Sequence, residues 1–169
     1  MDTLDSILGR RSIRKYKDKP IDKEIIEKII KLSMHAPSAR NQQPWHFIIV
    51  NNKELLTQIS SIHPYASMAK KAPLAIIICG DERSLISPTH WPQDCSAATQ
   101  NLLLAAYNYD IGSVWCGLYP DKEKIKKFQT LLKIEPKVIP FSLVVLGYPD
   151  EKPLSQDRFN KDKIHINKW

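Results

Sequence analysis

The residues best suited to chemistry in this sequence lie in segment 36–45, APSARNQQPW. The segment carries an arginine, an asparagine, two glutamines and a serine, and it contains two prolines, Pro37 and Pro44. Each proline fixes φ near −65° and lacks a backbone N–H group, so we expect a stiff loop. A stiff loop can present amide and guanidinium groups to a flat polar ligand with little loss of conformational entropy. An ordinary surface turn has the same composition, and the loop alone does not decide between these interpretations.

A second candidate is the basic run 10–15, RRSIRK, which follows a short apolar helix pattern. Four of its six residues are cationic, and Ser12 and Ile13 interrupt the charges. A guanidinium group matches two phosphate oxygens at once, which makes arginine the preferred cation for phosphate. The run beside the Ser12 hydroxyl therefore suits a phosphate group, although a solvated basic turn has the same composition.

Motifs for side-chain catalysis are absent from the sequence. There is no G-x-G-x-x-G after a strand, no Walker loop, no H-E-x-x-H and no G-x-S-x-G. The five histidines show no ligand spacing, and Cys79, Cys95 and Cys116 lie in apolar patterns without a C-x-x-C pair. This cysteine pattern argues against a disulfide framework and against a zinc site. A rigid polar loop and a phosphate-suited run without a nucleophile point to a cofactor that brings its own reactivity.

The periodicity of apolar residues predicts the elements that must position these segments. Isoleucines at helical spacing after Pro20 predict a helix with Asp22 as its N-cap, ending near Ala36. The alanine- and leucine-rich stretch 94–110 predicts a long central helix, with Gly112 just beyond its end. The unbroken apolar run 72–80 is typical of a strand buried on both faces. Further helices are predicted at 3–9, 53–60 and 122–133, and further strands at 45–50, 113–116 and 139–147.

The C-terminal segment differs in character from the rest of the chain. Residues 150–169, DEKPLSQDRFNKDKIHINKW, are polar with scattered apolar side chains, and they cannot form a core of their own. The terminal Trp169 favours docking on another surface over exposure to water. We therefore expect one domain over residues 1–149 and an arm over 150–169, without internal repeats or a second domain.

Length, composition and charge bound the class of protein. With 169 residues, 43% hydrophobic and 25% charged, the chain fits an ordinary globular domain. No apolar run reaches the roughly 18 residues of a membrane helix, and the opening MDTLDSILGRR is not a secretory signal, so we expect a cytoplasmic protein. The net charge of +7 suits nucleic acid, an acidic membrane surface or a phosphorylated ligand. The aromatic residues lie mainly in apolar strands, which argues against nucleic acid.

Four stretches together resemble the FMN-dependent nitroreductase family. They are RRSIRKY near the N-terminus, APSARNQQPWHF after the second predicted helix, DCSAATQNLLLAAYNYDIGSVW, and GYP followed by DRFNKDKIHINKW. They occur in the family's order and approximate spacing over nearly the whole chain. The resemblance implies an α+β fold with a mixed central sheet flanked by helices. It also implies a homodimer with an exchanged C-terminal arm, and FMN at the subunit interface.

The resemblance further implies which residues of this chain bind FMN. The N-terminal flavin motif and the arm would supply Arg10, Arg11, Ser12, Arg14 and Arg158. The partner chain would line the flavin ring with Pro37, Ser38, Ala39, Arg40, Asn41 and Gln43. Gly117 and Leu118 match the turn whose backbone amides approach N5 and O4 of the ring. A cation such as Arg14 would favour the anionic reduced ring, and a glycine lets the backbone approach it closely.

By the same resemblance, the activity would be a ping-pong oxidoreduction with NADH or NADPH as electron donor. Hydride would pass to flavin N5, and a nitroaromatic, quinone or related conjugated acceptor would then take two electrons in the same place. The resemblance implies no catalytic side chain and no metal. Tyr65 and Trp91 are candidates for the substrate-side wall, with plain packing as the alternative. The alternative function is a flavin-binding protein with little turnover or with a specialised substrate, such as dehalogenation or flavin or enoyl-type reduction.

Overall fold

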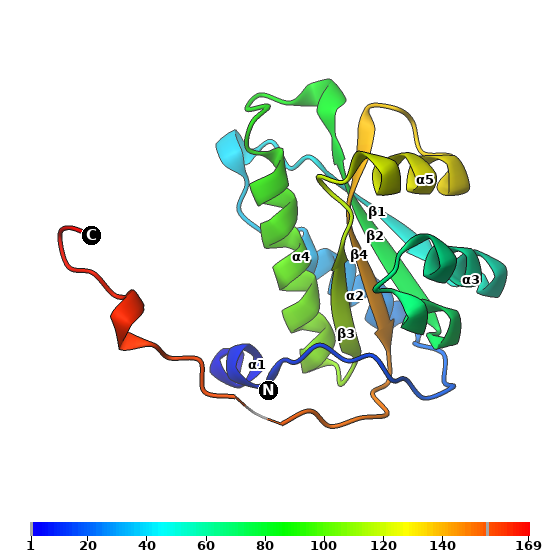
Figure 1. The fold of residues 1–169 in the computed structure, drawn as a ribbon, viewed down its shortest axis with the longest axis horizontal. Helices are drawn as coiled ribbons and strands as arrows, with labels where there is room; N and C mark the ends of the chain where they lie inside the picture. Colours follow the sequence, from blue (N-terminus) through cyan, green and yellow to red (C-terminus); the bar gives the residue numbers. More distant parts are fainter. Residues whose placement is uncertain (1, 155) are drawn as a thin grey trace.

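The computed structural model describes residues 2–154 and 156–169, which form an α+β fold (Figure 1). The α-helices are α1 Thr3–Gly9, α2 Lys23–Ser33, α3 Lys53–Ile62, α4 Trp91–Asn108 and α5 Lys122–Leu132. The strands are β1 Trp45–Val50, β2 Leu74–Asp81, β3 Gly112–Gly117 and β4 Val138–Gly147. Short 3-10 helices are η1 Ala39–Asn41, η2 Ser67–Lys71, η3 Glu82–Ser84 and η4 Lys161–Lys163. No helix of the described residues is long and apolar enough to span a bilayer.

The four strands form one antiparallel sheet in the order β1-β2-β4-β3. The N-terminal segment runs beside β3 and joins it through a parallel bridge between Ser12 and Ser113. The α+β fold class is confirmed, but the sheet differs from the mixed sheet that the resemblance implied. The parallel pairing does not extend along the described chain, because the next N–H groups, those of Arg14 and Lys15, donate to the Glu151 carboxylate instead of to β3.

Helices cover both faces of the sheet, and each face has its own apolar cluster. Helices α2 and α4 pack on one face, and α3 and α5 on the other (Figure 1). Side chains of β2 alternate between the clusters, so that Ile76 and Ile78 join the first and Ile77 and Cys79 the second. All eight residues of β2 are buried, which confirms the prediction of a strand covered on both faces. The three cysteines are buried free thiols.

The long helix α4 begins at Trp91, three residues before the predicted start. Trp91 is only 4% exposed, and its ring makes edge-to-face contacts with Tyr119 at 4.9 Å and Phe141 at 6.0 Å between centroids. A Cβ on Gly80 would lie 2.3 Å from the indole, so the glycine makes room for it. The prediction that Trp91 lies in a loop is wrong, because the residue begins α4. Burial of the indole removes its large apolar surface from water, which agrees with plain packing, the alternative to a place on the substrate side.

The end of α4 also differs from the prediction. Asp110, with φ of 58°, adopts the left-handed conformation just after the helix, and Gly112 begins β3 instead of stopping the helix. A Cβ on Gly112 would lie 2.8 Å from the Ile13 side chain. This glycine therefore permits the N-terminal segment to approach β3 closely.

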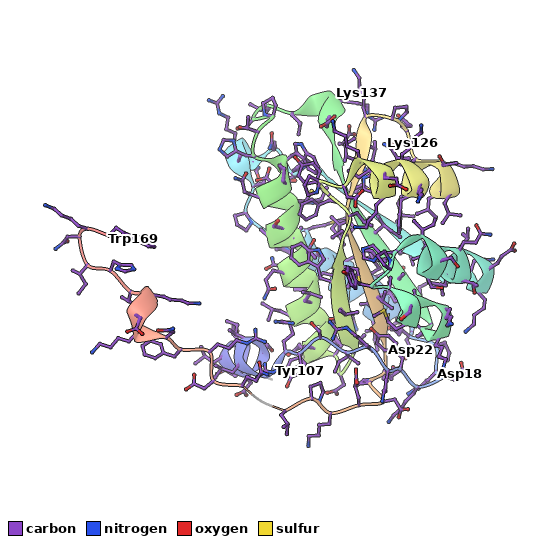
Figure 2. The ribbon with its side chains drawn as sticks, in the orientation of Figure 1. Asp18, Asp22, Tyr107, Lys126, Lys137 and Trp169 are labelled. Carbon is purple, nitrogen blue, oxygen red and sulfur yellow. The ribbon has the colours of Figure 1, made fainter. Side chains whose placement is uncertain are left out.

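The C-terminal arm, residues 150–169, leaves the body beside the N-terminal segment. At its root, one carboxylate oxygen of Glu151 accepts hydrogen bonds from the N–H groups of Arg14 and Lys15. The described residues beyond this root are exposed, and Trp169 lies at the far end, away from the body (Figure 2). Neither core cluster of the described residues contains a side chain of the arm, so the core of the body is complete without it.

The carboxylate of Asp81, at the end of β2, is held by Arg83. Arg83 donates to it from its backbone N–H and Nε at 2.9 Å and from Nη2 at 2.7 Å, and His46 Nε2 lies 3.3 Å away. The side-chain hydrogen bonds of Arg83 are the main reason why the pKa of Asp81 falls from 3.8 to about 2. Because the folded-state pKa is depressed, this stabilisation is present above pH 3.8 and is lost as the pH falls towards 2.

We expect Asp81→Asn to lower the free energy of unfolding by about 1 kcal/mol near neutral pH, after allowance for solvent screening. Urea unfolding of both proteins at about pH 7, 4 and 3 measures this difference. The difference should shrink steadily below about pH 4, because Asp81 of the unfolded chain then takes up a proton, whereas folded Asp81 does so only near pH 2. A difference of equal size at about pH 3 would show that the carboxylate charge is not its source.

Candidate functional site

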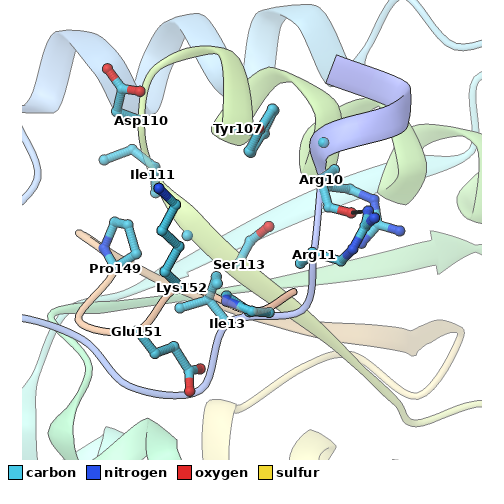
Figure 3. A pocket seen from close by; sticks show the side chains of 13 residues that line it. Arg10, Arg11, Ile13, Tyr107, Asp110, Ile111, Ser113, Pro149, Glu151 and Lys152 are labelled. Atoms are coloured by element: carbon cyan, nitrogen blue, oxygen red, sulfur yellow. Dashed lines mark hydrogen bonds between the residues drawn. The ribbon is translucent and has the colours of Figure 1, made fainter. Parts of the chain in front are cut away.

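The basic run of the N-terminal segment borders a cavity of about 290 Å³ between α1, the last turn of α4 and the root of the arm. Figure 3 shows Arg10 and Arg11 on one side of this cavity and Asp110 and Glu151 on the other. The two arginines thus lie where the helix α1 ends and the N-terminal segment begins. Their side chains are half-buried, so they are held near the body and still reach a ligand.

Arg158 of the arm joins these two residues in a cluster of three arginines. The pKa of Arg10 is lowered, first by burial and then by the charges of Arg158 and Arg11. Arg11 is fixed by carbonyl groups, because its Nη1 donates to Leu8 at 2.8 Å and its Nε to Leu154 at 3.4 Å. In the part of the chain that is described, no carboxylate forms an ion pair with Arg10 or Arg158. Gathered cations repel one another unless an anion joins them, so the cluster suits a phosphate group.

A second cavity, of about 610 Å³, lies on the α3 side of the sheet at the end of β3. Three predicted residues, Arg14, Tyr65 and Gly117, line it. Tyr65 is 77% exposed, so its ring is accessible to a ligand. A Cβ on Gly117 would meet no atom within 4 Å, whereas a Cβ on each other glycine would meet an atom closer than 3.0 Å. Packing within the chain does not require glycine here, and open space beside the backbone suits a closely approaching ligand.

Other side chains of this second cavity supply shape and charge. His63, Trp115, Cys116 and Lys124 line it, and Lys124 forms an ion pair with Asp121 at 2.8 Å. Burial raises the pKa of the Cys116 thiol, so the thiol stays protonated at neutral pH and is a poor nucleophile. Among the described residues, no group of three or more His, Cys, Asp or Glu side chains is placed to hold a metal ion.

Within the N-terminal motif and the turn 117–118, Ser12 and Leu118 line neither cavity. The Leu118 side chain is fully buried, and its N–H donates to the Phe141 carbonyl at 3.1 Å. Ser12 is half-buried beside Ser113 on β3. Gly117, and not Leu118, therefore brings this turn to the surface of the second cavity.

The polar loop 37–43 lies at the N-terminal end of α4 and borders neither cavity. The buried carboxylate of Asp94 accepts hydrogen bonds from the Ala39 N–H at 2.9 Å and from Gln42 Nε2 at 2.6 Å. Gln42 Oε1 in turn accepts from the N–H groups of Ile86 at 3.1 Å and Ser87 at 2.9 Å. These bonds fasten the loop to the first turn of α4 and to the segment before it.

The backbone of this loop is unusual. Arg40, Asn41 and Gln43 have φ of 51°, 54° and 45°, in the left-handed region that residues other than glycine seldom adopt. The Ser38 hydroxyl supports this shape by accepting the Gln43 N–H at 3.1 Å. The side chains of Arg40, Asn41 and Gln43 are exposed. The chain thus holds an unfavourable backbone conformation while the polar side chains face outward, a combination that is typical of binding segments.

The arginine cluster and the polar loop 37–43 stand at opposite ends of α4. The loop 37–43 is bound to the first turn through Asp94. The N-terminal motif begins beside the last turn, where a Cβ on Gly9 would clash with the Tyr107 side chain. The 18 residues of α4, at a rise of 1.5 Å each, make the helix about 27 Å long. A single chain therefore keeps the loop and the arginine cluster apart by about the length of this helix.

Sequence reasoning missed the residues that hold these parts in place. Asp94 and Gln42 were not singled out, although a carboxylate in the first turn of a predicted helix is a recognisable capping signal. His63 and Gly117 are 54 positions apart and hydrogen-bonded. No local pattern connects such distant residues.

The fold and the two cavities define an α+β protein with a cationic cluster suited to an anionic ligand and, apart from it, a cavity lined by aromatic and cationic side chains. Comparison with known families matches the Nitroreductase family over residues 7–63 and 61–148. These matches cover most of the chain, and the chain belongs to the nitroreductase family. The resemblance drawn from the sequence motifs is therefore confirmed.

Relatives agree with this assignment over their whole lengths. A protein named "Putative NADH dehydrogenase/NAD(P)H nitroreductase" from Archaeoglobus fulgidus is 49% identical, with 99% of each chain covered. A crystal structure of the same name from Parabacteroides distasonis is 41% identical, covers 99% of this chain and 98% of its own, and has a TM-score of 0.94. An FMN-dependent nitroreductase from Clostridium difficile is 30% identical, covers 98% of this chain and 99% of its own, and has a TM-score of 0.90.

Proposed function

We propose that this protein is an FMN-dependent NAD(P)H oxidoreductase that works as a homodimer, with FMN at the subunit interface. The observation that carries the proposal is that the arginine cluster and the polar loop 37–43 are separated by about the length of α4. The cationic half with Arg10 is suited to a phosphate, and the polar loop with Arg40 presents side chains outward from the other end. Two chains in antiparallel contact would place the loop of one beside the cavities of the other.

The residues present fit FMN. The cluster of Arg10, Arg11 and Arg158 offers several guanidinium donors for a phosphate, and among the described groups no carboxylate is ion-paired with Arg10 or Arg158. The open surface at Gly117 admits a flat ring close to the backbone. Arg14 lines the same cavity and would place a positive charge near the ring.

The chain itself would bind, orient and shield the reactants. When bound, FMN would supply the redox chemistry by accepting two electrons from NADH or NADPH and passing them to a nitroaromatic, quinone or related conjugated acceptor. Tyr65 offers an exposed aromatic face at the cavity wall for stacking of a planar donor or acceptor. The protonated thiol of Cys116 stays out of the reaction, and protons would come from water.

Exposed apolar side chains support the proposed pairing of two chains. They occur on α1 and along the arm, and they are Leu4, Ile7, Leu8, Leu154, Phe159, Ile164, Ile166 and Trp169. A single chain gains nothing from keeping so many large apolar groups in water. An arm that wraps the partner would bury them in an interface of the obligate type, of roughly 2,000 Å² or more.

The spectrum of the purified protein tests this function. We expect a yellow dimer that absorbs near ~450 nm because it carries FMN. NADH or NADPH should bleach the band, and a nitro compound or quinone should restore it. Flavin that is bleached but not restored by these acceptors would favour a specialised substrate, and flavin that is not bleached would favour a passive binder. A colourless dimer that takes up no FMN would refute the proposal.

A further inference from the structure

His63 is a buried imidazole whose two nitrogens are both engaged. It follows α3 and is 2% exposed. Its Nδ1 accepts the Tyr65 N–H at 3.2 Å, and its Nε2 lies 2.9 Å from the Gly117 carbonyl oxygen. Because Tyr65 donates and the carbonyl accepts, the hydrogen-bond pattern requires the neutral tautomer with the proton on Nε2. One side chain thus joins two walls of the second cavity, the turn after α3 and the end of β3.

The peptide unit between Gly117 and Leu118 is held at both ends. Its carbonyl oxygen accepts from His63, and its N–H donates to the Phe141 carbonyl at 3.1 Å. A trans peptide is a rigid plane, so two opposed hydrogen bonds fix its orientation. The Gly117 side of this plane faces the open space of the cavity, with no atom within 4 Å of a Cβ placed there.

The turn that carries Tyr65 is tied to the same place. The Tyr65 N–H donates to His63, and the Tyr65 carbonyl oxygen lies 3.5 Å from the Cys116 Sγ. The rings of His63 and Tyr65 meet edge to face at 6.2 Å between centroids. The position of the exposed tyrosine therefore depends on the imidazole as well as on the end of β3.

We infer that His63 is the positioning residue of the flavin site: it sets the Gly117–Leu118 peptide against the bound ring and aligns Tyr65 on the same cavity. This inference rests on the proposed function for the identity of the ligand. His63 performs no chemical step in this role, because both of its ring nitrogens are hydrogen-bonded to backbone groups and have no free proton to transfer. Its contribution is a preorganised wall, which lowers the loss of entropy on binding.

Two substitutions separate the donor at Nε2 from the acceptor at Nδ1. His63→Gln keeps an amide N–H near the position of Nε2, and His63→Asn keeps an acceptor near Nδ1 but loses the donor to Gly117. His46→Gln on β1, at the far edge of the sheet, is the matched control. Thermal unfolding of each variant shows that it is folded before binding is compared.

Two readouts are measured on the full chain. FMN affinity comes from quenching of flavin fluorescence, and the hydrogen exchange rate of the Leu118 amide reports the peptide without FMN. We expect His63→Asn to weaken FMN binding and to speed Leu118 exchange by about tenfold each, the effect of one lost buried hydrogen bond. His63→Gln and His46→Gln should stay within about threefold of the wild type.

The outcomes decide the inference. An equal loss of FMN affinity in His63→Gln and His63→Asn would show that the volume of the ring matters and not its donor. Wild-type FMN affinity and Leu118 exchange in His63→Asn would show that the hydrogen bond to Gly117 is dispensable. Either result overturns the inference. Nitrogen NMR of the wild-type imidazole gives a check without substitution, since a proton on Nδ1 in place of Nε2 would also overturn the inference. Absence of FMN binding in the wild type would instead reject the proposed function, while Leu118 exchange still tests the hold of His63 on the peptide.

Discussion

A chain that ends at Pro149 should keep its core but lose both pairing and FMN. The core clusters of the described residues contain no side chain of the arm, so near-native far-UV circular dichroism is expected. The truncation removes Arg158, which stands beside Arg10, together with the exposed apolar side chains of the arm. One lost charge-assisted partner weakens binding roughly tenfold to a hundredfold, and loss of the partner chain adds to this. Sedimentation should show monomer or aggregate, and fluorescence titration an FMN affinity lower on the order of 100-fold or more.

Full-length Arg158→Gln is the matched control for the truncation. It keeps the arm and should still form dimers, while FMN affinity falls by about tenfold through the lost charge. The comparison separates the contribution of the arm to pairing from its contribution to the phosphate site. A truncated chain that is still a dimer and still carries FMN would contradict the proposed clasp.

Removal of the Asp94 carboxylate is expected to have the second large effect. Asp94→Ala leaves the Ala39 N–H and Gln42 Nε2 without their acceptor in a mostly buried setting. Each such loss costs about 1–3 kcal/mol, so we expect the free energy of unfolding to fall by about 3 kcal/mol. For a domain of this size that is a drop of roughly 10 °C in melting temperature, measured by scanning calorimetry. The loop 37–43 should loosen, and FMN affinity should fall by about tenfold.

A double substitution controls for this result. Asp94→Asn alone places an amide beside the amide of Gln42, and Gln42→Glu alone places two carboxylates together. The two combined restore a donor–acceptor pair, and the Glu oxygens still accept from the segment before α4. We expect the double variant to recover at least half of the stability that the single substitutions lose. Equal stability of Asp94→Ala and the wild type would show that the carboxylate does not hold the loop.

The elements were predictable where local patterns decide them. The helix α1 and the strand β1 have the predicted bounds, and α3 exceeds its prediction only at the C-terminal end. The start of α4 was misplaced although Pro92 in its first turn is a recognisable start signal, whereas the packing of Trp91 on Gly80 could not be read from any local pattern. The end of α4 was misplaced for a similar reason, since Asp110 tolerates the left-handed conformation that was expected near a glycine.

The candidate site was only partly visible in the sequence. The loop 37–43 and the basic run stood out because their composition is too polar for a core and too specific for a linker. The hydrogen bonds that hold these segments in place were not visible in the sequence. The hydrogen bonds of Asp94 to the loop and of His63 to Gly117 join segments more than 50 positions apart.

The sequence alone determined the order of the elements, the two-faced burial of β2, the lack of a catalytic nucleophile motif and the family. These properties follow from periodicity, composition and short motifs, which act over a few neighbouring residues. The tertiary structure alone decided that the strands pair antiparallel in the order β1-β2-β4-β3, that Arg14, Tyr65 and Gly117 share one cavity, and that the arginine cluster and the polar loop lie at opposite ends of α4. The physical reason is that these relations depend on how both faces of one sheet are packed at once, and no single segment carries that information.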